Sequence, residues 1–69
     1  MRYGIVKWYN EGQGRGIIVP DDGSRELMVV HSDIAGEGFK VLFQGQRVRF
    51  EAGETKRGPA ARNVEVLGG

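Results

Sequence analysis

The chain has 69 residues, with ten basic and nine acidic side chains and a formal net charge of +1. This length allows one small domain, which we assign to residues 1–67, followed by a short tail at residues 68–69. With no cysteine and one histidine, the chain lacks disulfides, thiolate metal sites and multi-histidine metal sites, so we expect no metal and no cofactor. The charge is far from the strongly basic balance of many nucleic-acid-binding proteins and by itself identifies no partner.

The first residues contain no charged segment followed by an apolar one, and no run of about 18 apolar residues occurs in the chain. We therefore expect neither a secretory signal nor a membrane-spanning helix, and no membrane partner. The absence of cysteine fits a reducing compartment. The expected location is the cytoplasm.

Three strands are predicted in the first half of the chain. Residues 3–10 are rich in β-branched and aromatic side chains, residues 15–19 are mostly apolar, and residues 26–30 contain a continuous apolar run. Residues 20–24 have the composition of a turn. After the third strand we expect a single helical turn, with Ser32 as its N-cap.

Two more strands are predicted in the second half, at residues 46–52 and 62–67. Their alternating patterns place the inward-facing positions at Val48, Phe50, Val64 and Val66. Residues 35–46 and 53–59 are predicted loops, and the terminal glycines are expected to fray. Five short strands without an amphipathic helix predict an all-β barrel or sandwich.

The segment that begins at Gly12 has an unusual spacing of glycine. Gly12, Gly14 and Gly16 alternate with Gln13 and Arg15. In a strand the glycines would lie on one face and the longer side chains on the other. A row of glycines indicates tight curvature or a close approach of another backbone. The opposite face is then free to present side chains to a partner.

Residues suited to catalysis are sparse. His31 would need a serine and an acid, but its neighbour Ser32 points elsewhere in an extended chain. Asp21 and Asp22 are adjacent in a predicted turn, where a solvated pair is the usual case. The glycines are followed by an apolar run and Pro20, whereas phosphate-binding loops lead into a helix. We predict that the protein is not an enzyme.

Basic and aromatic side chains occur together at several places. Proteins that bind single strands combine cations that contact phosphates with flat side chains on which bases stack. Lys7, Trp8 and Tyr9 are adjacent, and Arg15 lies beside them if the first two strands pair. The same mixture recurs in the predicted loops, at Phe39, Lys40, Lys56 and Arg57. The alternative is that Tyr9 and Phe39 are core residues and the cations only solvate the surface.

Several segments, taken together, resemble those of bacterial cold-shock proteins nearly from end to end. The matching segments are residues 4–10, which read Gly-Ile-Val-Lys-Trp-Tyr-Asn, the turn at 20–24, the loop at 36–40 with 45–46, and residues 57–61 with 63–64. The resemblance implies a five-stranded antiparallel OB-fold β-barrel that binds single-stranded RNA and DNA by base stacking and phosphate contacts. It also implies a role as an RNA chaperone or as a regulator of transcription or translation.

The chain departs from this family where binding is expected. The family's first ribonucleoprotein motif reads Lys-Gly-Phe-Gly-Phe-Ile, and here Arg15 and Ile17 replace its two phenylalanines. The second motif reads Val-Phe-Val-His-Phe, and here Met28, Val30 and His31 stand at its second, fourth and fifth positions. Because three stacking rings are replaced by Arg15, Ile17 and Met28, we expect weaker binding that depends more on salt.

The predicted nucleic-acid site has Trp8 as its central platform. The secondary platforms are Tyr9, Arg15, His31 and Phe39, and the phosphate contacts are Lys7, Lys40 and Arg57. The complete candidate set is Lys7, Trp8, Tyr9, Asn10, Gln13, Arg15, Ile17, Met28, Val30, His31, Phe39, Lys40 and Arg57. As an alternative function, Ile17, Met28 and Val30 would form an exposed apolar patch for a homodimer or another protein.

Two structural questions remain open at this point. Strict alternation puts Lys7 and Trp8 on opposite faces, whereas the resemblance has both reaching the ligand, and a β-bulge near Trp8 would reconcile the two. Phe43 is aromatic where the family usually carries an acid. It is either a substitute platform or a residue that pins the loop to the barrel.

Overall fold

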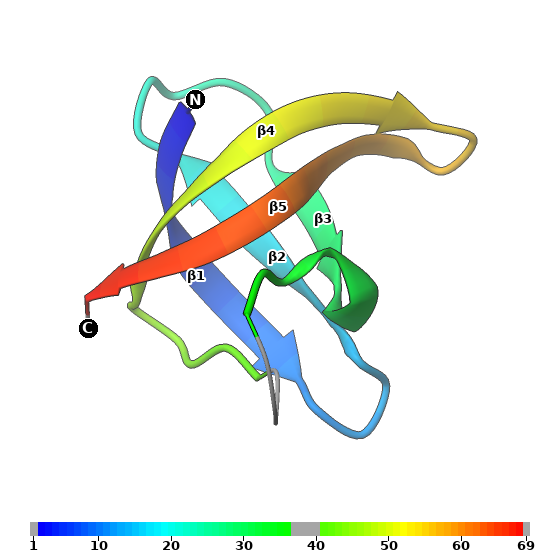
Figure 1. Ribbon diagram of the computed structural model, residues 1–69. Helices are drawn as coiled ribbons and strands as arrows, with labels where there is room; N and C mark the ends of the chain where they lie inside the picture. The colour runs from blue at the N-terminus through cyan, green and yellow to red at the C-terminus, as the bar shows by residue number, and fades with distance from the viewer. Residues whose placement is uncertain (1, 37–40, 69) are drawn as a thin grey trace.

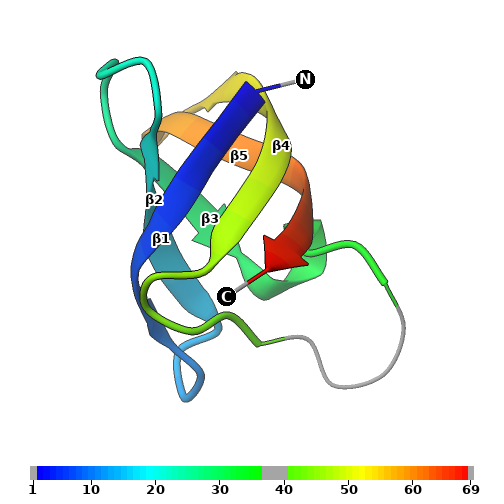
Figure 2. The ribbon, with the colours of Figure 1, turned by 90° about the vertical axis from the view of Figure 1, so that its left-hand side faces the viewer.

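The computed structural model describes residues 2–36 and 41–68, and its strands close into a barrel (Figure 1). The elements are β1 (Arg2–Asn10), β2 (Arg15–Pro20), β3 (Leu27–Val30), the 3₁₀ helix η1 (His31–Asp33), β4 (Arg47–Thr55) and β5 (Gly58–Gly68). Their order around the barrel is β1-β2-β3-β5-β4, and β4 pairs with β1 to complete the circle. Figure 2 shows β1 between β2 and β4. The predicted all-β barrel is confirmed.

One pair of strands is parallel. β1–β2, β2–β3, β1–β4 and β4–β5 are antiparallel, while β3 and β5 run in the same direction and meet at Met28 and Ala60. An odd number of strands in a closed ring cannot alternate in direction throughout, so at least one neighbouring pair must be parallel. The predicted five-stranded antiparallel barrel is therefore present, and β3–β5 is the one parallel pair that closes it.

The barrel interior is filled by apolar side chains from every strand. The buried cluster consists of Val6, Ile18, Leu27, Val29, Ile34, Leu42, Val48, Phe50, Ala61 and Val64. Val48 and Phe50 are completely buried, as the alternation in this strand predicts. The inward position predicted for Val66 is wrong, since this side chain is 45% exposed. Val66 lies near the end of β5, beyond the contacts with β3 and Ile34, where β4 is the paired neighbour.

Gly16 allows β1 and β2 to approach closely. A Cβ atom at this position would lie 2.4 Å from the carbonyl oxygen of Trp8, which no side chain tolerates. The predicted glycine row is nevertheless wrong at Gly12 and Gly14, because residues 11–14 form a turn and β2 begins at Arg15. The chain turns here because the carbonyl of Asn10 accepts the Gly14 N–H at 2.8 Å, with Gly14 at a φ of 69°.

Two other local predictions are corrected. Residues 53–59 are not a loop, because β4 continues to Thr55 and β5 begins at Gly58, with their backbones paired across the hairpin. The helical turn after β3 is present as η1, but Ser32 is not its N-cap. Val30 occupies the cap position without a side-chain hydrogen bond, and the His31 N–H donates instead to the carbonyl of Gly14 at 2.8 Å. Gly68, expected to fray, pairs with Arg47.

Candidate nucleic-acid interface

A β-bulge at Lys7 shapes the middle of β1. Val6 pairs with Ile18 and Trp8 pairs with Ile17, although Ile17 and Ile18 are consecutive in β2. Lys7 is therefore the extra residue of β1 at this point. Such a bulge changes the alternation of side chains and lets consecutive residues reach the same surface. Lys7 and Trp8 are both exposed, with 42% of Trp8 accessible to solvent. The bulge predicted near Trp8 is confirmed, and it resolves the conflict over these two side chains.

Two rows of side chains cross the outer surface of β1, β2 and β3. Directly opposite residues in antiparallel strands share a face, with Cβ atoms about 4.5–5.5 Å apart. The first row is Trp8, Ile17 and Met28, and the second is Asn10, Arg15 and Val30. We call these six residues the β1–β3 face. It consists of the exposed indole on β1, the half-buried apolar side chains of Ile17, Met28 and Val30, and the exposed polar side chains of Asn10 and Arg15.

The second row is tied to the turn between β1 and β2. The Asn10 side-chain oxygen accepts the backbone N–H of Gln13 at 3.0 Å, and the Gln13 side-chain oxygen accepts Arg15 Nε at 3.0 Å. Arg15 is exposed, as predicted for the outward side of β2. His31 is also exposed and lies against the turn, since a Cβ at Gly14 would be 3.3 Å from its Nδ1.

Tyr9 has a divided environment. It pairs with Gly16 and packs against the buried cluster, although part of the side chain stays accessible. Burial, with a smaller contribution from the charge of Glu11, raises the pKa of the Tyr9 phenol. The ring supports the core and still reaches the surface. The two interpretations made from the sequence, a stacking platform and a core residue, are therefore both compatible with its position.

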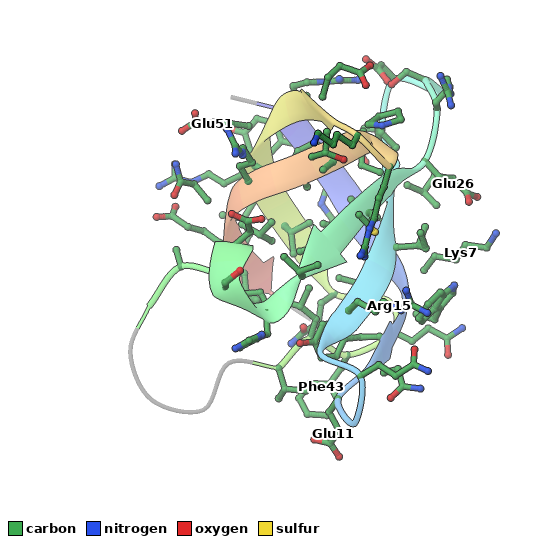
Figure 3. All side chains as sticks on the ribbon, turned by 90° about the vertical axis from the view of Figure 1, so that its right-hand side faces the viewer. Lys7, Glu11, Arg15, Glu26, Phe43 and Glu51 are labelled. Carbon is green, nitrogen blue, oxygen red and sulfur yellow. The ribbon has the colours of Figure 1, made fainter. Side chains whose placement is uncertain are left out.

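The charge of Lys7 is partly neutralised by an acid that the sequence analysis did not identify. The Lys7 ammonium lies 2.9 Å from a carboxylate oxygen of Glu26, and both side chains are about half exposed. Figure 3 shows Glu26, Lys7 and Arg15 along one side of the barrel, with Glu51 on the opposite side. The two partners are 19 residues apart, so no local pattern could reveal the pair.

Three arginines away from this surface also have acidic partners. Arg2 pairs with Asp22, Arg47 with Asp21, and Arg49 with Glu65. A near-neutral chain can therefore still present positive charge locally, because these arginines are offset by carboxylates while Arg15 bonds to a neutral amide. On the β1–β3 face, the positive charge of Arg15 can therefore act on an anion, since its bond is to a neutral amide.

The remaining candidates are less closely grouped. Arg57 is exposed in the turn between β4 and β5, on the β3 side of the barrel (Figure 1), and its N–H donates to the Thr55 hydroxyl at 3.1 Å. Phe39 and Lys40 lie outside the described residues. Phe43 is 63% exposed, which contradicts the interpretation that it pins the loop to the barrel. Leu42, only 2% exposed, has that role.

Within the described residues, no helix is long and apolar enough to cross a membrane, and no group of three or more acidic or histidine side chains is placed to hold a metal ion. A five-stranded β-barrel with this strand order is an OB-fold, whose strands 2 and 3 and adjoining loops form the usual oligonucleotide face. The geometry thus defines the class as an OB-fold barrel with a mixed aromatic, apolar and basic surface.

Comparison with known proteins identifies the family. The family model described as 'Cold-shock' DNA-binding domain matches residues 2–67, and the chain belongs to this cold-shock domain family, which is non-enzymatic and binds nucleic acids. The Cold shock-like protein CspC of Buchnera aphidicola subsp. Acyrthosiphon pisum is 52% identical over 64 residues, covering 93% of each chain. CspC and CspE of Escherichia coli strain K12 are each 50% identical over the same length and coverage.

Proposed function

We propose that this protein binds single-stranded RNA and DNA on the β1–β3 face, with Trp8 as the central stacking platform. The observation that carries the proposal is the exposed indole beside Lys7 and opposite Ile17. Stacking of a base on an aromatic ring contributes about 1–3 kcal/mol and tolerates any base. An ammonium group next to the ring supplies the phosphate contact that such binding also needs.

The other candidate residues have supporting roles in this proposal. Arg15 can stack on a base and pair with a phosphate through its planar guanidinium group. Tyr9, His31 and Phe39 add flat rings, and Lys40 and Arg57 contact phosphates. Asn10 and Gln13 hold the turn and contact the ligand, while Ile17, Met28 and Val30 provide apolar contact without a ring face. Affinity is therefore lower, and the dependence on salt steeper, than on a face that keeps all the family's rings.

A face that stacks bases without reading their edges suits transient binding of many transcripts. We therefore assign the protein a cytoplasmic role as an RNA chaperone, or as a regulator of transcription or translation, with residues 1–67 as the functional domain. The assignment builds on membership of the cold-shock domain family, to which the relatives named cold shock-like proteins also point.

A fluorescence titration tests the proposal. Trp8 is the chain's one tryptophan, so its emission reports directly on the proposed platform. A pyrimidine-rich oligonucleotide is expected to quench this emission, with a lower affinity at the higher of two salt concentrations. No change at low salt and high protein concentration would reject nucleic-acid binding at this face.

A protein-interaction role is the second candidate. It is favoured by Ile17 and Met28, which are directly opposite each other in β2 and β3, and by Val30, two residues further along β3 on the same face. These side chains are half-buried, so the patch is smaller than the one predicted from sequence. Sedimentation of the wild type and of Met28→Asp tests this role. A monomer that is unaffected by the substitution and still binds oligonucleotide contradicts it.

A further inference from the structure

Phe43 is the most exposed large apolar residue in the described part of the chain. It is 63% accessible, whereas Trp8 is 42% and Leu67 is 49% accessible. A phenyl ring in water gains nothing for folding, and Leu42 already anchors the segment in the core. The stability of the barrel therefore does not account for a ring at this position.

The backbone around Phe43 is held in place. Residues 43–46 form a turn in which the Gln46 N–H donates to the Phe43 carbonyl at 3.2 Å and Gly45 has a φ of 89°, as in a type II turn. The Gln46 side-chain oxygen accepts the Phe43 N–H at 2.9 Å. Because the backbone is fixed at both ends of the turn, the ring is presented without a large loss of loop entropy on binding.

The turn is attached to β1 immediately before the bulge. The Val6 N–H donates to the Gln46 carbonyl at 3.0 Å, and the Val6 carbonyl accepts the Gly45 N–H at 2.8 Å. Val6 pairs with Ile18 of β2 on its other side. The turn therefore occupies the next strand position beyond β1, in a sheet where neighbouring strands are about 4.8 Å apart. Figure 2 shows this segment passing alongside β1.

We propose that Phe43 is an additional stacking platform, which extends the β1–β3 face beyond β1 and accepts one further unpaired nucleobase. This inference rests on the proposed function. We prefer a nucleobase to an apolar protein partner because the turn is hydrogen-bonded to Val6, which directly precedes Lys7 and the proposed platform Trp8 in β1. Flat rings interleaved with cations are the chemistry of single-strand binding.

Alanine and leucine variants separate stacking from apolar contact. With an oligothymidylate long enough to cover the whole face, Phe43→Ala and Phe43→Leu are each expected to weaken binding by about 5- to 140-fold. Phe43→Trp is expected to retain it. Leu67→Ala removes another exposed apolar side chain, near the end of β5, and is expected to change affinity by less than about twofold.

The outcomes distinguish this inference from the proposed function. Wild-type affinity in Phe43→Ala or in Phe43→Leu overturns the stacking platform while leaving binding at Trp8 intact, and so does an equal loss in Leu67→Ala. Failure of the wild type to bind at all rejects the proposed function itself. As a direct readout, 4-fluorophenylalanine at position 43 is expected to shift its fluorine resonance on addition of oligothymidylate, and an unmoved resonance in the bound state overturns the inference.

Discussion

Glu26 lies where it opposes the proposed binding of a phosphate at Lys7. Its carboxylate is 2.9 Å from the Lys7 ammonium, and both side chains are about half exposed. A phosphate that approaches Lys7 must either break this ion pair or share the ammonium with a second anion. Replacing Glu26 with glutamine keeps the shape of the side chain and removes the negative charge. We expect Glu26→Gln to strengthen binding.

The size of the gain follows from two small terms. In the wild type, binding of a phosphate at Lys7 breaks an exposed ion pair and costs about 0.2–1 kcal/mol. In Glu26→Gln there is no ion pair to break, so this cost disappears. Two like charges about 4 Å apart in water repel each other by about 1 kcal/mol. Together these give about 1–2 kcal/mol, or a decrease in Kd of about 5- to 25-fold at low salt. Fold stability should change by less than about 1 kcal/mol, because the pair is exposed.

The assay is the anisotropy of a labelled oligonucleotide across a series of salt concentrations. Glu51→Gln is the matched control, because it makes the same change in net charge on the opposite side of the barrel (Figure 3). If Lys7 gains a full phosphate contact, the slope of log affinity against log salt should steepen by about 0.7 in Glu26→Gln. The control should show a smaller gain and an unchanged slope.

A double-mutant comparison decides whether Lys7 transmits the effect. In a Lys7→Ala background, Glu26→Gln should lose the part of its benefit that comes from freeing the ammonium group. Equal gains from Glu26→Gln with and without Lys7, or equal gains from Glu26→Gln and Glu51→Gln, would refute the reasoning. The change would then be a general effect of net charge.

Three further perturbations test other parts of the structure. Trp8→Ala should weaken oligonucleotide binding by about 5- to 140-fold in anisotropy titrations, while a melt shows an intact fold, because the indole is largely outside the core. Gly16→Ala should lower the free energy of unfolding, measured in urea, by about 2 kcal/mol or more, because the new Cβ would meet the Trp8 carbonyl. Gly53→Ala is the control and should be tolerated, since a Cβ there would lie 3.4 Å from its nearest neighbour. Hydrogen bonds from Ser24 hold the pKa of Asp22 below its usual range. The ionised carboxylate therefore stabilises the fold above about pH 4, and this stabilisation is lost as the pH falls through the lowered pKa. Melting temperatures between neutral and acidic pH should therefore decline less in Asp22→Asn than in the wild type, and parallel declines would contradict this.

The sequence predicted those parts of the fold that depend on local periodicity. Val48 and Phe50 are buried because the first half of β4 alternates and lies between β1 and β5 in the barrel. Val66 follows the same alternation and is exposed, because the end of β5 lacks the second neighbour. The burial of a strand residue depends on chain segments that are distant in sequence. The alternation within one strand therefore cannot predict it.

The glycine-rich segment shows a second limit. Gly16 was correctly interpreted as a point of close backbone approach, but Gly12 and Gly14 belong to a turn. The decisive feature is Asn10, whose side-chain and backbone oxygens accept hydrogen bonds from the residues that follow. A pattern of alternate glycines fits a strand and a turn equally well until those bonds are known.

The exposure of candidate site residues was predictable where residue type was informative. An indole beside a lysine predicted an exposed pair, and the bulge that makes the pair possible was inferred from the conflict between the two side chains. The partner of Lys7 was not predictable, because Glu26 comes next to it only when β1, β2 and β3 are assembled. The two roles considered for Phe43 were equally consistent with the sequence, and the exposure of this side chain excludes the role of pinning the loop.

Closure of the barrel affects how this chain behaves when it is crowded. Ile5 and Val19 are exposed β-branched residues, opposite each other on β1 and β2, and such positions would be an aggregation hazard on an open sheet. Here β1 already pairs with β2 and β4, and β2 with β1 and β3, so neither strand has a free edge to template a second chain. Assembly into intermolecular sheets through these strands therefore requires the barrel to open, so at a given protein concentration its rate should rise with the fraction of chains that are unfolded.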